Sequence, residues 1–317
     1  MPDGSTAVSV QNLVKVFRTP SGGELRAVNG ISFDVQAGEI FGLLGPNGAG
    51  KTTTMEIVEG IQKPTAGSAS ILGIDVTHDF DRIKPRIGVQ LQESEYLEYL
   101  SLRELLVLFA SFYGKRADPE ETLESFGLEE KAKEAISKLS GGQKRRFSLA
   151  LSLVNDPDVV FLDEPTSGLD PQARRGLWDQ VLKIREKGKT VVMTTHHMDE
   201  AKVLCDRVGI IDHGAIKALG TPLQLIRSLD SAYHIRFITG DVFPELRFAG
   251  ITGAVGLTKT ETKDGLLYDL EIHDPAESLG EFHAVLTELL LRTDDIRVEP
   301  STLEDVFLSL TGRELRD

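Results

Sequence analysis

The chain contains 317 residues, 40% of them hydrophobic and 26% charged, a composition that favours an ordinary globular protein with two domains. Its formal net charge is -14, and residues 231–317 alone hold 17 acidic against 8 basic side chains. This acidity argues against nucleic acid as a partner, because a phosphate backbone binds where positive charge gathers.

The cysteine content and the N-terminal residues predict a soluble, cytoplasmic protein. Cys205 is the single cysteine, so an internal disulfide is excluded. Residues 1–10 show neither the basic nor the apolar segment of a secretory signal. No apolar run approaches the ~20 residues that span a bilayer, so any membrane association is expected to be peripheral.

The first predicted elements are strands. Valines alternate with polar residues over 8–16, a Gly-rich loop follows at 19–24, and a second strand is predicted over 27–35. The continuous apolar run at 40–44 is typical of a buried parallel strand, and a helix is predicted from residue 51 to 60.

The middle of the chain is predicted to be mostly helical over 101–154, where apolar side chains recur at helical spacing. Two further buried strands, 159–162 and 190–194, flank a predicted helix at 171–187. Strand, helix and strand in this order predict a parallel sheet.

A domain boundary is predicted near 228–231, where the acidic excess begins. Beyond it we expect a small α+β domain. Its predicted strands are 233–238, 254–258, 266–272 and 296–299, and its predicted helices are 279–291 and one from Thr302, capped by Ser301 and Glu304.

A phosphate-binding loop is predicted between the strand at 40–44 and the helix that follows. Its residues fit the pattern G-x-x-x-x-G-K-[ST] and are Gly45, Pro46, Asn47, Gly48, Ala49, Gly50, Lys51, Thr52 and Thr53. Glycines allow backbone N–H groups to converge on phosphate oxygens at a helix N-terminus. We expect Lys51 to reach the β- and γ-phosphates of a nucleotide and Thr52 to ligate Mg²⁺. A Gly-rich turn with a chance lysine is the weaker interpretation, because strand and helix both stand where the loop needs them.

Candidate catalytic residues follow two buried strands. Asp163 is predicted to hold Mg²⁺ through water, and Glu164 to polarise the attacking water. His196 ends the next strand and is predicted to contact the γ-phosphate, with His197 as the competing candidate. Acids at a strand end and a lone histidine are often structural, but the phosphate loop favours catalysis.

Two further residues are predicted to meet the nucleotide. A glutamine after the apolar stretch 87–89 is expected to reach Mg²⁺ or water when ATP is present; Gln90 and Gln92 both fit, and we prefer Gln92. Phe17, at the end of the first strand pair, is predicted to stack on adenine rather than to serve as an ordinary core aromatic.

A second helix start also offers groups that bind phosphate. It consists of Leu139, Ser140, Gly141, Gly142 and Gln143. Its backbone N–H groups and the Ser140 hydroxyl can hold a γ-phosphate. We predict that it serves the ATP of a second chain, because two loops at separate edges cannot share one nucleotide. The basic run 144–146 is interpreted as a solvated helix face.

These residues, in this order, resemble the ATP-binding subunits of ABC transporters over residues 8–225. The matching motifs are the aromatic Phe17, Walker A (Gly45–Thr53), the Q-loop (Gln92), the signature (Leu139–Gln143), Walker B (Phe161–Glu164), the D-loop (Ser167–Asp170) and the H-loop (His196). Segments 205–222 and 300–314 are similar to the daunorubicin-resistance branch of drug exporters, which carries a C-terminal accessory domain. Gly168 stands where many relatives have Ala, and the Q-loop lacks the commoner aromatic-Val-Pro-Gln form.

The resemblance implies an α/β P-loop NTPase of residues 1–228, with an antiparallel β subdomain and a helical subdomain at about 93–155, followed by a small α+β domain at 229–317. It implies ATP and Mg²⁺ as cofactors and a head-to-tail homodimer in which Asp170 crosses to the other chain's site. The implied membrane partner is a separate permease of the ABC-2 class, reached at the inner face of the cell membrane. We expect residues 93–100, with Tyr96 and Tyr99, to contact it.

Two other classes share this ATPase chemistry. A chromosome-maintenance or DNA-repair ATPase would need a long coiled coil between Walker A and the signature, and residues 54–138 are too few. A ribosome-associated ATPase would carry two cassettes, whereas each motif occurs once. The acidic charge also argues against both.

Overall fold

The computed structural model describes residues 5–20, 22–90, 96–116, 118–242 and 246–312. The chain forms two compact units that divide between residues 222 and 223. Among the described residues, every helix is too short or too polar to cross a membrane.

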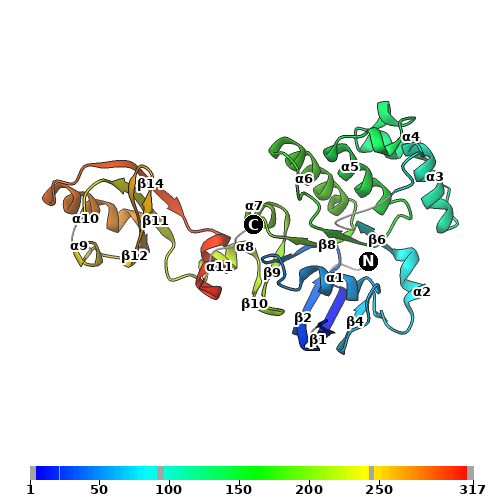
Figure 1. The fold of residues 1–317 in the computed structure, drawn as a ribbon, viewed down its shortest axis with the longest axis horizontal. Helices are drawn as coiled ribbons and strands as arrows, with labels where there is room; N and C mark the ends of the chain where they lie inside the picture. Colours follow the sequence, from blue (N-terminus) through cyan, green and yellow to red (C-terminus); the bar gives the residue numbers. More distant parts are fainter. Residues whose placement is uncertain (1–4, 21, 91–95, 117, 243–245, 313–317) are drawn as a thin grey trace. The chain divides into compact units, whose positions relative to one another are not determined.

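The first unit is built on a six-stranded sheet in the order β10-β9-β3-β8-β7-β6 (Figure 1). Its strands are β3 (Ile40–Leu44), β6 (Ile87–Gln90), β7 (Val159–Asp163), β8 (Thr190–Thr195), β9 (Arg207–Asp212) and β10 (Ala215–Gly220). All pairs are parallel except that of β10 with β9. The predicted parallel sheet is therefore confirmed, and β3 and β7 are buried along their whole length, as apolar runs require.

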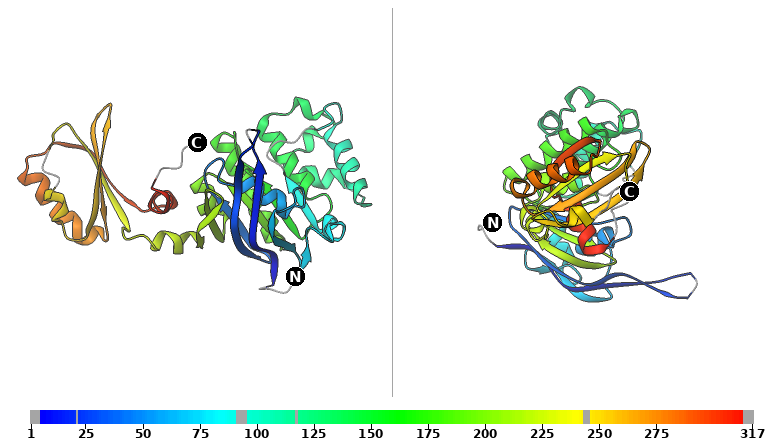
Figure 2. Two further views of the ribbon diagram at one scale, coloured as in Figure 1. Left: turned by 60° about the horizontal axis from the view of Figure 1, so that its bottom comes forward. Right: turned by 90° about the vertical axis from the view of Figure 1, so that its left-hand side faces the viewer.

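A second, antiparallel sheet has the order β2-β1-β4-β5. Its strands are β1 (Thr6–Arg18), β2 (Glu24–Gln36), β4 (Ala66–Ile71) and β5 (Ile74–Asp75). One apolar core joins this sheet to β3 and to helix α1 (Lys51–Val58), and the rings of Phe33 and Phe41 stack across it at 5.0 Å. Figure 2 shows the β1–β2 hairpin extending away from the rest of the unit.

Helices make up most of the remaining first unit. They are α2 (Phe80–Ile83), α3 (Leu102–Phe112), α4 (Pro119–Ser125), α5 (Gly141–Ser152), α6 (Pro171–Glu186), α7 (Met198–Leu204) and α8 (Pro222–Arg227), the last of which spans the division between the units. Short 3₁₀ turns cover Lys84–Arg86, Glu129–Lys131 and Ile136–Lys138. The region predicted as mostly helical is thus divided, because Gly114 and Gly127 take left-handed backbone angles and end α3 and α4. Figure 1 shows α5 and α6 on the side of the parallel sheet opposite α1.

The second unit is a four-stranded antiparallel sheet in the order β12-β13-β11-β14, with α9 and α10 on one face and α11 beyond the other (Figure 2). Its elements are β11 (Tyr233–Thr239), α9 (Leu246–Ala249), β12 (Ala254–Thr262), β13 (Gly265–Ile272), α10 (Pro275–Glu288), β14 (Thr293–Pro300) and α11 (Leu303–Thr311). The core lies between sheet and helices, where the rings of Phe237, Phe248, Tyr268 and Phe282 pack together. The predicted α+β character is confirmed.

Two details of the second unit differ from the prediction. Helix α10 begins at Pro275 rather than at residue 279, because Asp274 caps it and proline suits the first helical position. The cap of α11 is Thr302, with Asp305 three residues later, so the prediction of Ser301 and Glu304 was wrong by one residue. Ser301 instead donates its hydroxyl to the Ser231 carbonyl and is buried.

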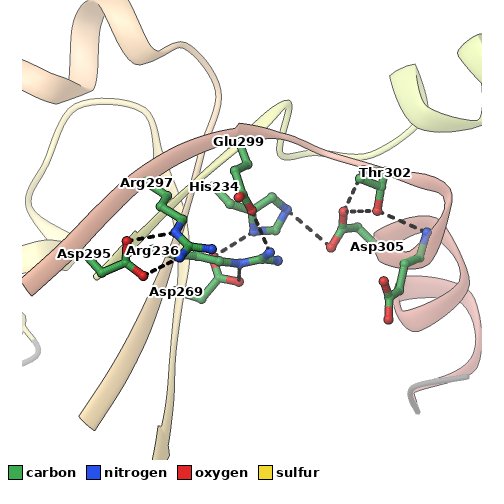
Figure 3. Close-up of polar contacts among 9 residues, drawn as sticks. His234, Arg236, Asp269, Asp295, Arg297, Glu299, Thr302 and Asp305 are labelled. Carbon is green, nitrogen blue, oxygen red and sulfur yellow. Dashed lines mark hydrogen bonds and ion pairs between the residues drawn. The ribbon is translucent and has the colours of Figure 1, made fainter. Parts of the chain in front are cut away.

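The face of this sheet away from α10 carries charged side chains. Arg236 donates to Asp269 and to Glu299, and His234 lies between Asp269 and Asp305 (Figure 3). The contact between His234 and Asp305 connects the sheet to α11.

Candidate functional site

Parallel register brings three predicted motifs to one edge of the first unit's large sheet. Strands β3 and β7 both pair with β8 in parallel. The loop after Leu44, the acids Asp163 and Glu164, and His196 therefore leave the sheet at the same carboxyl edge, where ligands of such sheets bind.

The predicted phosphate loop has the backbone of an anion site. Gly48 and Gly50 have φ angles of 77° and 101°, which only glycine adopts without strain. A Cβ atom at Gly50 would lie 2.3 Å from the carbonyl oxygen of Ala27, so the position has no room for another residue. Helix α1 starts at Lys51, and its free N–H groups face the loop as a phosphate requires.

Lys51 is held inside the site by three oxygens. Its Nζ donates to the carbonyls of Gly45 at 2.8 Å and Pro46 at 3.1 Å, and it lies 3.2 Å from Glu164 Oε1. Burial lowers the pKa of Lys51, and the nearby Glu164 and Asp163 charges offset only part of that effect. The Lys51 side chain thus bends back over the loop. Phosphate oxygens could there replace the three oxygens that its ammonium contacts.

Glu164 lies between two basic side chains. One carboxylate oxygen is 3.2 Å from Lys51 Nζ and the other is 3.2 Å from His196 Nδ1. Burial would raise the pKa of Glu164, but Lys51 and His196 outweigh it and hold the pKa below its usual value. Its φ angle is 44°, a strained conformation that is retained where the surroundings enforce it, and its N–H donates to Thr194 Oγ1 at 3.0 Å. The geometry therefore presents an ionised carboxylate at a fixed point.

The residues predicted to hold a metal fit a hard cation. Thr52 Oγ1 lies 3.4 Å from Asp163 Oδ1, and the Thr194 hydroxyl also donates to that carboxylate oxygen. A hydroxyl next to a carboxylate is the oxygen donor set that Mg²⁺ takes in nucleotide sites. Gln92 lies outside the described residues. Gln90, the alternative, is 1% exposed and pairs with Leu162 of β7.

Ser140 begins α5 with a complete capping box. Its hydroxyl accepts from the Gln143 N–H at 3.3 Å, and the Gln143 side chain accepts from the Ser140 N–H at 2.9 Å. The segment lines an open groove of about 590 Å³ together with Gly168, Leu169 and Asp170. Among the described residues that line this groove, none belongs to the phosphate loop and neither Glu164 nor His196 is present.

Asp170 and Phe17 occupy exposed or half-buried positions. Asp170 is the cap of α6, and its Oδ1 accepts from the N–H groups of Gln172 and Ala173. Phe17 lies near the end of the β1–β2 hairpin, half-buried, with Lys15 Nζ 5.0 Å from the centre of its ring. The ring is thus outside the buried core of the unit.

Sequence reasoning missed the hydroxyls that order this edge. Thr194 bonds both acids of the pair, and Glu200, Thr166 and Trp178 form a buried network beside His196. Two adjacent threonines at the end of a strand with an apolar middle were the signal, since hydroxyls inside a sheet need partners.

Comparison with known proteins gives a consistent result. The family described as "ABC transporter" matches residues 28–167. The chain is 40% identical over 315 residues to "Nod factor export ATP-binding protein I" of Burkholderia lata, covering 98% of each chain. It is 35% identical to "Linearmycin resistance ATP-binding protein LnrL" of Bacillus subtilis, covering 98% of this chain and all of that one.

Solved structures agree. The dimeric ATP-binding cassette MJ0796, in a post-hydrolysis state with ADP and phosphate, is similar with a TM-score of 0.62 and 27% identity, over 68% of this chain and 98% of that chain.

Proposed function

This chain belongs to the ABC transporter family as an ATP-binding subunit with ATPase activity coupled to transport, and on this premise we propose that it powers export through separate membrane subunits. Two relatives support export, since their names describe Nod factor export and linearmycin resistance. The proposed dimer is head-to-tail and encloses two ATP molecules.

One observation supports the dimer: the two helix ends that are predicted to bind phosphate have lining residues that do not overlap. The groove at Ser140 shares no described lining residue with the loop around Lys51. A single nucleotide cannot reach both within one copy, so a second copy turned head to tail is the simple way to use both. Dimeric cassettes among the similar structures support this arrangement.

Each residue of the site has a proposed role. Lys51 and the loop N–H groups would bind the phosphates, and Phe17 would stack on adenine. Thr52, Asp163 and Gln92 would hold Mg²⁺, which neutralises charge on the phosphates. Glu164 would accept a proton from the attacking water, and His196 would hold the γ-phosphate in line. The loop residues Gly45, Asn47, Gly48, Ala49, Gly50 and Thr53, with Ser140, Gly141, Gly142, Gln143 and Asp170 of the other copy, would complete the nucleotide contacts.

We propose the domain arrangement that the motifs predict. Residues 1–228 would form the nucleotide-binding domain, and residues 229–317 an accessory domain of the drug-exporter branch. The protein would lie at the inner face of the cell membrane, bound to an ABC-2-type permease.

A groove of about 580 Å³ in the first unit supports the permease contact. Its lining includes Tyr96, Phe109, Phe112 and Tyr113, and the nearby Tyr99 is 94% exposed. Exposed aromatic rings of this kind mark binding surfaces. Replacing Tyr96 and Tyr99 by Ala should weaken membrane association and ATPase coupling in the assembled transporter, and intact coupling in the double variant would exclude this surface.

The variant Glu164→Gln tests the hydrolytic site. Without the carboxylate the attacking water loses its base, so turnover should fall by about 100-fold or more, while ATP binding and ATP-dependent dimerisation persist. Steady-state phosphate release and size-exclusion chromatography with ATP measure the two properties. Ordinary turnover in this variant would refute the role of Glu164.

A further inference from the structure

Glu200 is a buried carboxyl that the proposed hydrolysis does not use. It lies in the first turn of α7, four residues after His196, and its exposed fraction is 0%. Burial raises the pKa of Glu200, although its hydrogen bonds favour the charged form and act in the opposite direction. Burying a carboxyl is costly unless it is bonded, so its partners show what it holds in place.

Two donors from the neighbouring elements meet at one oxygen of Glu200. Thr166 Oγ1 donates to Oε1 at 2.9 Å, and Trp178 Nε1 donates to the same atom at 3.1 Å. Thr166 follows Glu164 by two residues and begins the segment 166–170 that leads into α6, and Trp178 lies on α6. The Glu200 carboxyl therefore holds segment 166–170 directly at Thr166. It also holds the segment indirectly, through Trp178 of the helix that follows it.

The same carboxyl adjoins the residue that ends β8. The Thr195 hydroxyl favours the charged form of Glu200, and it accepts from the His197 N–H at 2.9 Å. The Thr195 carbonyl accepts from the N–H of Gly45, the first residue of the phosphate loop, at 3.3 Å. Thr195, the residue beside Glu200, thus contacts both His197 and Gly45. It joins the backbone around His196 to the start of the phosphate loop.

The network still contains two unmet polar atoms. Glu200 Oε2 and Arg174 Nε are buried, and neither has a hydrogen-bond partner in the part of the chain that the structure describes. Arg174 lies on α6, and its charge acts on Glu200. These two atoms lie on α6 and α7, the two helices that the network joins.

We propose that Glu200 is a positioning residue that couples the two half-sites of the dimer, by making the position of segment 166–170 depend on the loop that carries His196. The inference rests on the proposed function, in which Asp170 at the end of that segment reaches the other copy's ATP. Nucleotide bound against His196 in one site would then set the position of the Asp170 that serves the other site.

Steady-state ATPase of the full chain tests this coupling. Glu200→Ala and Thr166→Val, measured below the melting temperature of each variant, should each lower kcat about tenfold, because misplaced groups lose catalysis steeply, while ATP affinity changes little. Glu200→Gln should restore most of the activity, since its amide oxygen accepts both donors. The Hill coefficient for ATP should fall toward one in Glu200→Ala and Thr166→Val. Glu186→Ala, which removes an exposed carboxylate from α6 outside this network, is the matched control and should behave as wild type.

The double variant Glu200→Ala/Thr166→Val separates positioning from general damage. If both residues act through one contact, the double variant should lose no more than either single one, whereas independent damage would multiply the losses. Should Glu200→Ala fail to fold, Thr166→Val and Trp178→Phe remove the two donors one at a time and take its place.

Wild type and Glu164→Gln, measured alongside, keep the two proposals distinguishable. Normal turnover and an unchanged Hill coefficient in Glu200→Ala and Thr166→Val, with an active wild type and an inactive Glu164→Gln, would overturn the coupling role alone. Losses of kcat that merely follow weakened ATP binding would also overturn it. A wild type that does not hydrolyse ATP would refute the proposed function and this inference together.

Discussion

Glu164 and Glu59 are two buried glutamates of one unit with opposite ionisation. Glu164 meets Lys51 and His196, which keep its pKa low. Glu59, 2% exposed at the end of α1, lacks such a basic partner among the described residues: burial, followed by repulsion from Asp163 and Glu56, raises its pKa to about 8. Its Oε1 has no hydrogen-bond partner in the same described part of the chain. Pairing, rather than depth, decides which carboxyl carries charge.

Glu59→Gln should therefore stabilise the protein at neutral and higher pH. The folded chain keeps a proton on Glu59 that the unfolded chain releases above the ordinary glutamate pKa of 4.5, so stability is lost as pH rises from there to about 8. At pH 7 this difference costs the wild type about 3 kcal/mol. Urea unfolding at about pH 5 and about pH 8 measures it, with the exposed Glu186→Gln as control. If the free energy of unfolding depended on pH in the same way in wild type and Glu59→Gln, the raised pKa of Glu59 would be contradicted.

Helix α11 is connected to the sheet of the second unit through one histidine (Figure 3). His234 Nδ1 lies 2.8 Å from Asp269 Oδ1, and its Nε2 lies 3.5 Å from Asp305 Oδ1. The other oxygen of Asp305 accepts from the N–H and the hydroxyl of Thr302 and so completes the cap of α11. A charged imidazole can serve both carboxylates, whereas a neutral ring offers one proton.

The attachment of α11 should accordingly weaken as pH rises. Burial lowers the pKa of His234, but the hydrogen bond to Asp269 and the charges of Asp269 and Asp305 outweigh it and the opposing Arg236, so the pKa is raised above 6.5. Its stabilising effect is complete below the unfolded value and is lost as pH rises through the folded one. Hydrogen exchange of the α11 amides, corrected for intrinsic rates, should show more protection in wild type than in His234→Gln at about pH 6 and equal protection at about pH 9. If the difference in protection between wild type and His234→Gln persisted unchanged at about pH 9, the charge of His234 would be excluded as its cause.

At the level of the whole molecule, the separation of the two proposed phosphate-binding helix ends predicts an enzyme that hydrolyses ATP only as a dimer. Ser140→Arg should place a bulky charge in the groove that would face the second copy's nucleotide. ATP binding by the isolated chain should stay largely intact, while hydrolysis should be abolished. Titration with ATP and phosphate release measure the two, and Ser125→Arg on the exposed surface of α4 is the control. Hydrolysis at the wild-type rate in Ser140→Arg would refute the shared site.

Which features could be predicted from the sequence depends on how far apart in the chain the interacting residues lie. The phosphate loop, the acid pair and the parallel sheet rest on local patterns, and the sheet with its edge of motifs was predicted correctly. The Asp274 cap with Pro275 was also local and was missed, although the signal was present. The bonds of Thr194 to the acid pair and of Glu200 to Thr166 join separate segments, so they depend on strand register and helix packing that no local pattern carries.

The contact between Lys51 and Glu164 also bears on how spent nucleotide leaves. The Lys51 ammonium that would bind the phosphates also has a carboxylate and two carbonyl oxygens at 2.8–3.2 Å. Once the γ-phosphate has gone, these groups would compete with ADP for Lys51. They would compete less well with ATP, because ATP carries more negative charge. Exchange of phosphate oxygens for these partners would therefore assist the release of ADP from the proposed site.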